Sequence, residues 1–272
     1  MKAKTAVFSL AAVLCLLTGG SAWGKVIYVD DDAPTGGDGA SWTTAYRFLQ
    51  DALTAAKAAG EAVEIRVAQG TYKADQSAAK PQGTKDRYES FTLVDDLTLL
   101  GGYAGIGADD PNARDFEAYE TILSGDLTGN DVEITDVTLL RSEDTRNENT
   151  RDLVYVKGSR ALLEGFTITG AVNAGTYVGS WIVDSIIRDC LFQGNRGGEG
   201  DFQLGGGALT VYGQLRVVRC SFIGNTGATG AMRTEDTVFE DCVFTGNYGW
   251  DVMGGGCILQ PFDFHRLYLH RE

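Results

Sequence analysis

The sequence predicts an all-β fold in which short parallel strands stack as the coils of a solenoid. Three observations predict it: abundant glycine, a nine-residue unit that occurs four times, and an alternation of apolar and polar side chains within each unit. The 272 residues include 36 glycines but 4 prolines, and 43% are hydrophobic, which is a globular composition with many tight turns. The net charge of -14 argues against nucleic acid or an anionic membrane surface as a partner.

The first 24 residues are expected to form a secretory signal peptide. A basic start at Lys2 and Lys4 precedes an apolar run over 6–17, and small residues follow up to Ala22-Trp23-Gly24. The run is too short to cross a bilayer comfortably, and no later segment holds 18 consecutive apolar residues. We therefore expect that the mature chain has no membrane span and is secreted or held in the cell envelope.

The four nine-residue units align without gaps and begin at Leu163, Ile187, Val217 and Phe239. Repeats at intervals of 20–50 residues indicate a solenoid, a propeller or an array. Inside each unit, successive side chains alternate between two faces, so each unit is a strand and not a helix. Glycine-rich segments such as 206–209 recur after the units, which adds a second short strand to each coil.

Coils of this length with several short strands are typical of a parallel β-helix, whose equivalent residues stack about 4.8 Å apart. Stacking predicts three files of identical side chains along the axis. They are Phe192, Phe222 and Phe244; Asn195, Asn225 and Asn247; and Cys190, Cys220 and Cys242. We expect these three thiols to be buried and free, since an odd number in register leaves one without a partner. Cys257 lies in the other strand of its coil and is expected to react first.

The F-x-G-N unit followed by a G-G-A-[IL] segment is best seen at 192–195 and 206–209. This pattern resembles the repeats of right-handed parallel β-helix proteins of the pectin-lyase-like superfamily, in particular the polymorphic outer-membrane protein repeat. The resemblance covers about residues 150–260 and implies a right-handed parallel β-helix, whereas it implies little about function. Two units depart from the pattern, with Thr229-Gly230 for the glycine pair and Ala171 for asparagine.

The N-terminal part predicts an entry to the same solenoid. It has an alternating strand over 26–30, a loop rich in glycine and aspartate, a helical stripe over 44–59 closed by Gly60, and a strand over 63–68. The helix is expected to cover the open end of the solenoid, whose strand edges would otherwise pair with other chains. This order is similar to the entry of secreted β-helix proteins, some of which are polysaccharide lyases.

The mature chain is therefore expected to have three parts. They are the N-terminal strand, capping helix and first coil over 25–70, the β-helix coils over 71–258, and an irregular end over 259–272 that is either a short cap or a truncation. Further strands are expected at 91–93, 97–99, 121–123, 134–140 and 153–156. The polar run over 141–152 is expected to protrude as a loop.

Calcium-assisted elimination is the enzymatic hypothesis to weigh. It needs carboxylates to hold Ca²⁺ at a uronate and a base to take the α-proton. The candidate carboxylates are Asp184, Asp189, Glu199, Asp201, Asp236 and Asp241. No lysine lies between 158 and 272, so the base would be Arg188, Arg196, Arg216, Arg219 or Arg233. Arginine is a poor base, and no catalytic residue is assigned.

Other polar groups have structural interpretations beside functional ones. The same position in three successive units is held by Asp189, Arg219 and Asp241. These residues form either half of an acidic binding site or a charge ladder that keeps the coils in register. We favour the charge ladder. Asp95-Asp96 is expected to form a turn.

Asp30, Asp31 and Asp32 with Asp38 offer oxygen ligands for Ca²⁺, but position 34 is proline and the EF-hand pattern is not met. We therefore predict no metal or cofactor site, with Ca²⁺ as the cation to consider. Trp42, Trp181 and Trp250 lie either in the core or on the surface.

Two function classes remain open. The first is a secreted or cell-envelope scaffold without enzymatic activity, a monomer that is structural, adhesive or in contact with a polysaccharide or another cell-surface component. The alternative is a polysaccharide lyase-like enzyme that acts on an acidic polysaccharide with Ca²⁺. Both histidines lie in the last eight residues. The absence of lysine and histidine from the coils over 158–264 favours the scaffold.

Overall fold

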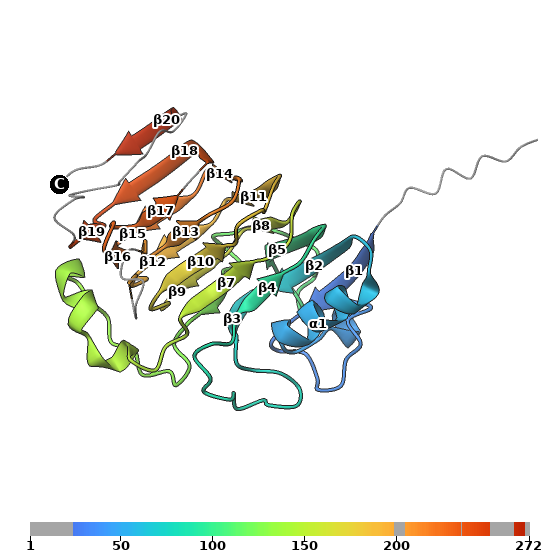
Figure 1. The fold of residues 1–272 in the computed structure, drawn as a ribbon. Helices are drawn as coiled ribbons and strands as arrows, with labels where there is room; N and C mark the ends of the chain where they lie inside the picture. Colours follow the sequence, from blue (N-terminus) through green and yellow to red (C-terminus); the bar gives the residue numbers. More distant parts are fainter. Residues whose placement is uncertain (1–23, 199–204, 235, 251–263, 270–272) are drawn as a thin grey trace, which may run out of the picture.

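The chain winds into a parallel β-helix whose walls are three rows of strands (Figure 1). The computed structural model describes residues 24–198, 205–234 and 236–250, and the backbone of 264–269. Successive coils pair in parallel in all three rows, for example β11 with β14, β12 with β15 and β10 with β13. This confirms the predicted all-β parallel β-helix with a small N-terminal helix.

The first two rows belong to one 13-stranded sheet, which turns at a bend in every coil. The first row contains β1 (Lys25–Val29), β2 (Val63–Ala68), β5 (Leu97–Tyr103), β8 (Leu162–Glu164), β11 (Ser185–Arg188) and β14 (Leu215–Val218). The second row contains β3 (Gly70–Lys73), β6 (Thr121–Ser124), β9 (Thr167–Thr169), β12 (Leu191–Gln193) and β15 (Ser221–Ile223). The rows join through β18 (Thr237–Thr245), which pairs with both β14 and β15 and also with β20 (Phe264–Leu269).

The third row is a separate five-stranded sheet. It contains β4 (Phe91–Leu93), β7 (Asp152–Val156), β10 (Ala174–Val178), β13 (Leu209–Val211) and β17 (Met232–Thr234). Two short strands, β16 (Thr226–Gly227) and β19 (Tyr248–Gly249), pair at a corner of the last coils. From β2 to β17, each coil therefore runs from the first row to the second row and then to the third.

The helix begins later than the sequence predicted, at Leu49 and not at 44. The chain first makes a short 3-10 turn, η1 (Trp42–Thr44), and then α1 (Leu49–Ala59). Between them the backbone is extended, because the Tyr46 N–H donates to the Tyr28 carbonyl and the Tyr46 carbonyl accepts from the Asp30 N–H, both at 2.9 Å. The helix packs against β1, β2 and β4 and covers this end of the coils, as expected (Figure 1).

The segment between β6 and β7, here called the 125–151 excursion, differs from its prediction. The strand expected over 134–140 is absent from it, since residues Val137–Ser142 form the 3-10 helix η2, with η3 (Asp144–Arg146) close behind. The Asp136 side chain accepts from the Thr138 N–H and so favours a helical turn. The excursion does not simply protrude, because Arg146 is buried and donates to the Gly194 carbonyl at 2.9 Å.

The phenylalanine file is present inside the second row. The rings of Phe192 and Phe222 stack with centroids 4.8 Å apart and planes 4° apart, and those of Phe222 and Phe244 stack at 4.5 Å and 3°. All three side chains are buried. The predicted inward face of these strands is therefore confirmed.

The asparagine file closes the corner after the second row. The Asn225 Oδ1 accepts from the backbone N–H and the side-chain amide of Asn195, and Asn247 does the same for Asn225, at 2.9–3.0 Å. Each amide also donates to a carbonyl of the preceding coil, as Asn225 does to Phe192 at 2.9 Å. At the corner, the backbone leaves the sheets and loses their hydrogen bonds. The asparagine side chains supply hydrogen-bond partners for these buried backbone groups.

The cysteine file follows the bend between the first two rows. Asp189, Arg219 and Asp241 bend the chain there with left-handed backbone, at φ of 53°, 50° and 52°. The next residue in each coil, Cys190, Cys220 or Cys242, is a buried free cysteine. Burial raises the pKa of Cys220 well above its usual value and that of Cys242 to about 11.

We expect these three thiols to resist alkylation in the native protein at pH 8, because all three are buried and the raised pKa values of Cys220 and Cys242 keep those two protonated. Mass spectrometry of peptides after iodoacetamide treatment should show Cys190, Cys220 and Cys242 unmodified in native protein and modified in guanidinium. A disulfide between any two of them, or their alkylation without denaturant, would contradict the inward file. Cys257, which we expect to react first, lies outside the described residues.

Candidate functional site

A groove with a volume of about 640 Å³ runs over the outer face of the third row. Its walls come from successive coils, because outward-facing side chains of neighbouring parallel strands stand side by side. The lining residues used below are Tyr88, Arg151, Asp152, Tyr155, Asn173, Tyr177 and Tyr212, together with Ser180 from the turn after β10.

Three tyrosines form the floor of this tyrosine groove. Tyr155 on β7 and Tyr177 on β10 are directly paired across the sheet, and their rings meet edge to face with centroids 5.3 Å apart. The ring of Tyr212, just after β13, lies 5.7 Å from that of Tyr177. Consecutive coils thus present a continuous aromatic strip parallel to the solenoid axis.

Two arginine–tyrosine pairs lie at opposite ends of the strip. The Arg151 guanidinium lies 5.4 Å from the ring centre of Tyr88, which is 76% exposed before β4. At the other end, Arg233 on β17 lies 5.2 Å from the ring centre of Tyr212 and donates to its hydroxyl at 3.0 Å. The strip and its flanks therefore extend across all five strands of the third row.

One carboxyl group, that of Asp152, lines the groove among the residues that the structure describes there. It accepts a hydrogen bond from the Asn173 amide at 2.7 Å. Burial raises the pKa of Asp152 above its usual value, against the lowering effects of Asn173 and Arg151. The position therefore favours a protonated carboxyl more than an exposed aspartate does.

Burial also raises the pKa of Tyr177, with Tyr212 and Tyr155 as further causes. A phenol with a raised pKa stays protonated at neutral pH, so Tyr177 is a hydrogen-bond donor with an apolar ring face and not a base. The arrangement can bind a flat, hydroxyl-bearing ligand along its length.

Among the described residues, the carboxylates suggested for elimination do not converge. Asp184 and Asp236 precede β11 and β18 at the corner that leads into the first row, but the coil of β14 lies between these two strands. Asp241 is exposed at its bend. Glu199 and Asp201 lie outside the described residues.

The arginines suggested as bases have other partners. Arg219 donates to Asp189 through two nitrogens at 2.7 and 2.6 Å, which forms the expected acid–base rung. Arg188 pairs with Glu164, and Arg216 with Glu240 at 2.8 Å. Arg196 is buried and donates to the Arg141 carbonyl at 3.0 Å.

The predicted turn at Asp95-Asp96 is present, with Asp96 at φ 57°. Its carboxylate forms a two-point ion pair with Arg160 of the next coil, at 2.6 and 2.7 Å. This pair has the same form as that of Asp189 and Arg219, which favours the register role for both.

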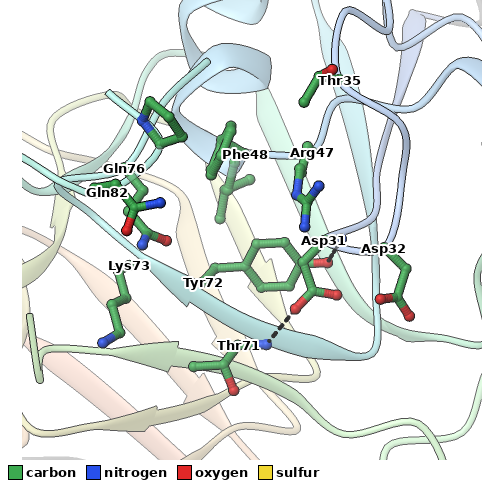
Figure 2. A pocket seen from close by; sticks show the side chains of 12 residues that line it. Asp31, Asp32, Thr35, Arg47, Phe48, Thr71, Tyr72, Lys73, Gln76 and Gln82 are labelled. Atoms are coloured by element: carbon green, nitrogen blue, oxygen red, sulfur yellow. Dashed lines mark hydrogen bonds between the residues drawn. The ribbon is translucent and has the colours of Figure 1, made fainter. Parts of the chain in front are cut away.

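The aspartates considered for Ca²⁺ near the N-terminus are partly brought together. Carboxylate oxygens of Asp30, Asp31 and Asp32 lie within 4.8 Å of one another beside a pocket of about 460 Å³ (Figure 2). Asp38 instead accepts from Thr44 in its own loop at 2.7 Å.

Backbone N–H groups donate hydrogen bonds to two of these carboxylates. Asp30 accepts from the N–H of Ile106 at 2.6 Å. Asp31 accepts from that of Thr71 at 3.1 Å, as Figure 2 shows. Burial raises the pKa of both Asp30 and Asp31. These hydrogen bonds give the cluster a structural role, tying the loop after β1 to β3 and to the loop after β5.

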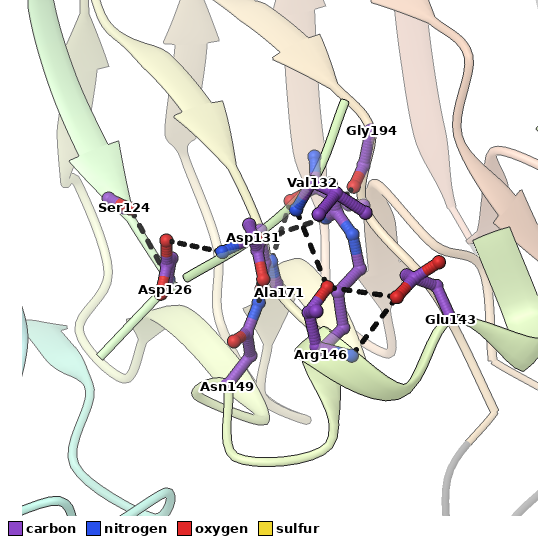
Figure 3. A network of polar contacts seen from close by, with 12 residues as sticks. Ser124, Asp126, Asp131, Val132, Glu143, Arg146, Asn149, Ala171 and Gly194 are labelled. Atoms are coloured by element: carbon purple, nitrogen blue, oxygen red, sulfur yellow. Dashed lines mark hydrogen bonds and ion pairs between the residues drawn. The ribbon is translucent and has the colours of Figure 1, made fainter. Parts of the chain in front are cut away.

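A second acidic cluster, Asp126, Asp131 and Glu148, anchors the 125–151 excursion (Figure 3). Asp126 accepts from three backbone N–H groups, the nearest that of Gly129 at 2.6 Å. Asp131 pairs with Arg146 at 3.3 Å and accepts from the Asn149 amide at 3.0–3.1 Å. Both carboxylates therefore have protein partners.

The three tryptophans have different environments. Trp42 is buried, packs against Tyr28 and Tyr103, and donates to Asn112 at 3.0 Å. Trp250 stacks with Arg141 of the excursion at 4.5 Å. Trp181 is 93% exposed.

The comparisons with known proteins concern the fold. No protein-family model and no curated protein matches the chain. The chain is similar to the crystal structure of pectate lyase Pel9A, with a TM-score of 0.49 and 15% identity over 86% of this chain and 57% of that one. It therefore spans a little more than half the length of that lyase. The strand register given above establishes the parallel β-helix by itself.

Across the described residues, no helix is long and apolar enough to cross a membrane.

Proposed function

We propose that this chain is a glycan-contacting β-helix protein that holds a polysaccharide lengthwise in the tyrosine groove. The observation that carries the proposal is the strip formed by Tyr155, Tyr177 and Tyr212 on successive coils. A solenoid repeats its surface along one axis, and a polysaccharide repeats along its chain. A rigid repeating strip is therefore suited to a repeating, extended ligand.

The groove has both surfaces that a sugar needs. Tyrosine faces offer flat apolar area to the C–H face of a pyranose, and tyrosine hydroxyl groups can form hydrogen bonds to its hydroxyls. Asp152 and Asn173 supply an acceptor and a donor at the side of the strip, with Arg151 beside them. A few polar groups around an aromatic floor are typical of small-ligand sites.

The described lining favours binding over elimination. Calcium-assisted elimination needs several carboxylates and a base, whereas the described residues of the groove offer Asp152 as a carboxyl group and Arg151 as a basic one. A polysaccharide lyase remains the alternative that the test below can reveal. The predicted signal peptide supports a location outside the cytoplasm, where a polysaccharide would be met.

Replacing Tyr177 by alanine should weaken polysaccharide binding about tenfold, because it removes the central ring of the strip. The measurement is isothermal titration of the mature protein with a panel of neutral and uronate-containing oligosaccharides. Tyr177→Phe keeps the ring and should retain most of the affinity.

Tyr248→Ala is the matched control, since Tyr248 is 39% exposed on β19 and does not line the groove. Equal affinities for Tyr177→Ala and wild type, or no binding across the panel, would contradict the proposal. Ultraviolet absorbance from unsaturated products, formed with added Ca²⁺ and acidic polysaccharide, would establish the lyase instead.

A further inference from the structure

Trp181 combines two unusual properties in the turn between β10 and β11. Its side chain is 93% exposed, more than any other exposed large hydrophobic side chain in the described residues. Its backbone also has φ of +71°. Single exposed apolar residues are ordinary, but left-handed backbone is rare for a bulky residue and carries strain that glycine would avoid.

The turn that carries Trp181 is held on both sides. The Gly179 N–H donates to the Val156 carbonyl at 3.1 Å, and the Ile182 carbonyl accepts from the Gln214 N–H at 2.8 Å. Ile182 itself is buried. The backbone around the exposed indole is therefore fixed to the preceding and following coils, which lowers the entropy cost of using the side chain in binding.

The same turn borders the tyrosine groove. Ser180 lines the groove, and a Cβ placed on Gly179 would lie 3.6 Å from the Tyr155 hydroxyl oxygen. Trp181 is the next residue along the chain, so its Cα lies about 3.8 Å beyond that of a groove residue. The residue that carries the exposed indole thus directly follows a groove residue in the chain.

We propose that Trp181 is a sugar-stacking platform that extends the tyrosine groove and engages oligosaccharides longer than the groove itself. This inference rests on the proposed glycan binding. The ligand class is a pyranose unit of the same polysaccharide, whose C–H face lies against the indole ring. Glycine at 181 would relieve the backbone strain but would remove the platform.

The test compares Trp181→Gly with wild type over oligosaccharides of increasing length. Wild-type affinity should rise about five- to tenfold once the ligand is long enough to reach Trp181, and the variant should lack this rise while it binds the shortest ligands as wild type does. The variant should also have a higher Tm, because glycine tolerates positive φ. Tyr177→Ala, in contrast, should weaken short and long ligands alike.

Fluorescence gives a second measurement. Emission of wild type should shift to shorter wavelength at saturation with a long ligand, and Trp181→Phe should lack most of this shift while it keeps part of the affinity gain. Equal affinity of wild type and Trp181→Gly for every ligand would overturn the platform and leave the groove proposal intact. If neither protein binds any oligosaccharide, both proposals fail together. If the substitution instead abolishes self-association seen by ultracentrifugation, Trp181 is a contact between copies and the platform is overturned.

Discussion

Replacing Phe222 by alanine is expected to lower the free energy of unfolding by about 3–5 kcal/mol. Phe222 is fully buried and stacks on both sides, against Phe192 at 4.8 Å and Phe244 at 4.5 Å. Its loss leaves a cavity between two aromatic rings that adjacent coils hold in place, so the site cannot collapse to fill it. Urea denaturation followed by circular dichroism measures the change.

Ser221→Ala on the same strand is the matched control. Ser221 faces outward and is half-buried, so its replacement should cost under about 0.5 kcal/mol. Equal losses at Ser221 and Phe222 would mean that the strand presents both faces to similar surroundings, against the register observed.

Replacing Asn225 by alanine is expected to cost about 3 kcal/mol, although it removes no apolar surface. Asn225 is fully buried, and its loss leaves the Asn195 N–H and the Phe192 carbonyl without these partners in the corner. Each unsatisfied buried group costs about 1–3 kcal/mol. The exposed Asn147, which bonds to Asp144 in its own turn, provides the control Asn147→Ala with a small expected effect.

Asn225→Asp separates the hydrogen-bond role from packing. The aspartate keeps the shape, but it loses the donor and buries a carboxyl group, whose pKa should rise in the folded state. The folded state then binds a proton more tightly than the unfolded state, so stability should fall as the pH rises through about 4 and above. A variant with the same stability at pH 4 and pH 8 would contradict a buried, donor-dependent corner.

The coils were predictable because their signal is local and repeated. The spacing of Cys190 and Phe192 repeats without gaps in later units, and parallel stacking converts equal positions in sequence into neighbours in space. The prediction of the helix start was wrong because the contact that determines it is not local in sequence. Ala45 fits the helical stripe, but the backbone of Tyr46 bonds to β1, and this contact is not visible from local periodicity.

The tyrosine groove was not predicted. Tyr155, Tyr177 and Tyr212 lie on neighbouring strands, yet unequal numbers of residues separate them because the corner before β13 is longer than that before β10. A search for a constant spacing therefore misses them. The signal that could have found them is a tyrosine at or just after the end of three successive third-row strands, β7, β10 and β13. Of the candidate carboxylates that the structure describes, Asp184 and Asp236 lie two coils apart along the axis, and the coil of Arg219 lies between Asp189 and Asp241.

The anchoring of the 125–151 excursion sets an order of events for folding. Its Arg146 bonds to the carbonyl of Gly194, and its Arg141 stacks on Trp250, so its partners follow it in the chain by many residues. A chain that emerges from its N-terminus can add coils one after another, because each coil needs the preceding one as a template. The excursion must wait until the later coils that contain Gly194, just after β12, and Trp250, just after β19, exist. It is therefore expected to become protected from proteolysis among the last segments of the protein, although it is made midway.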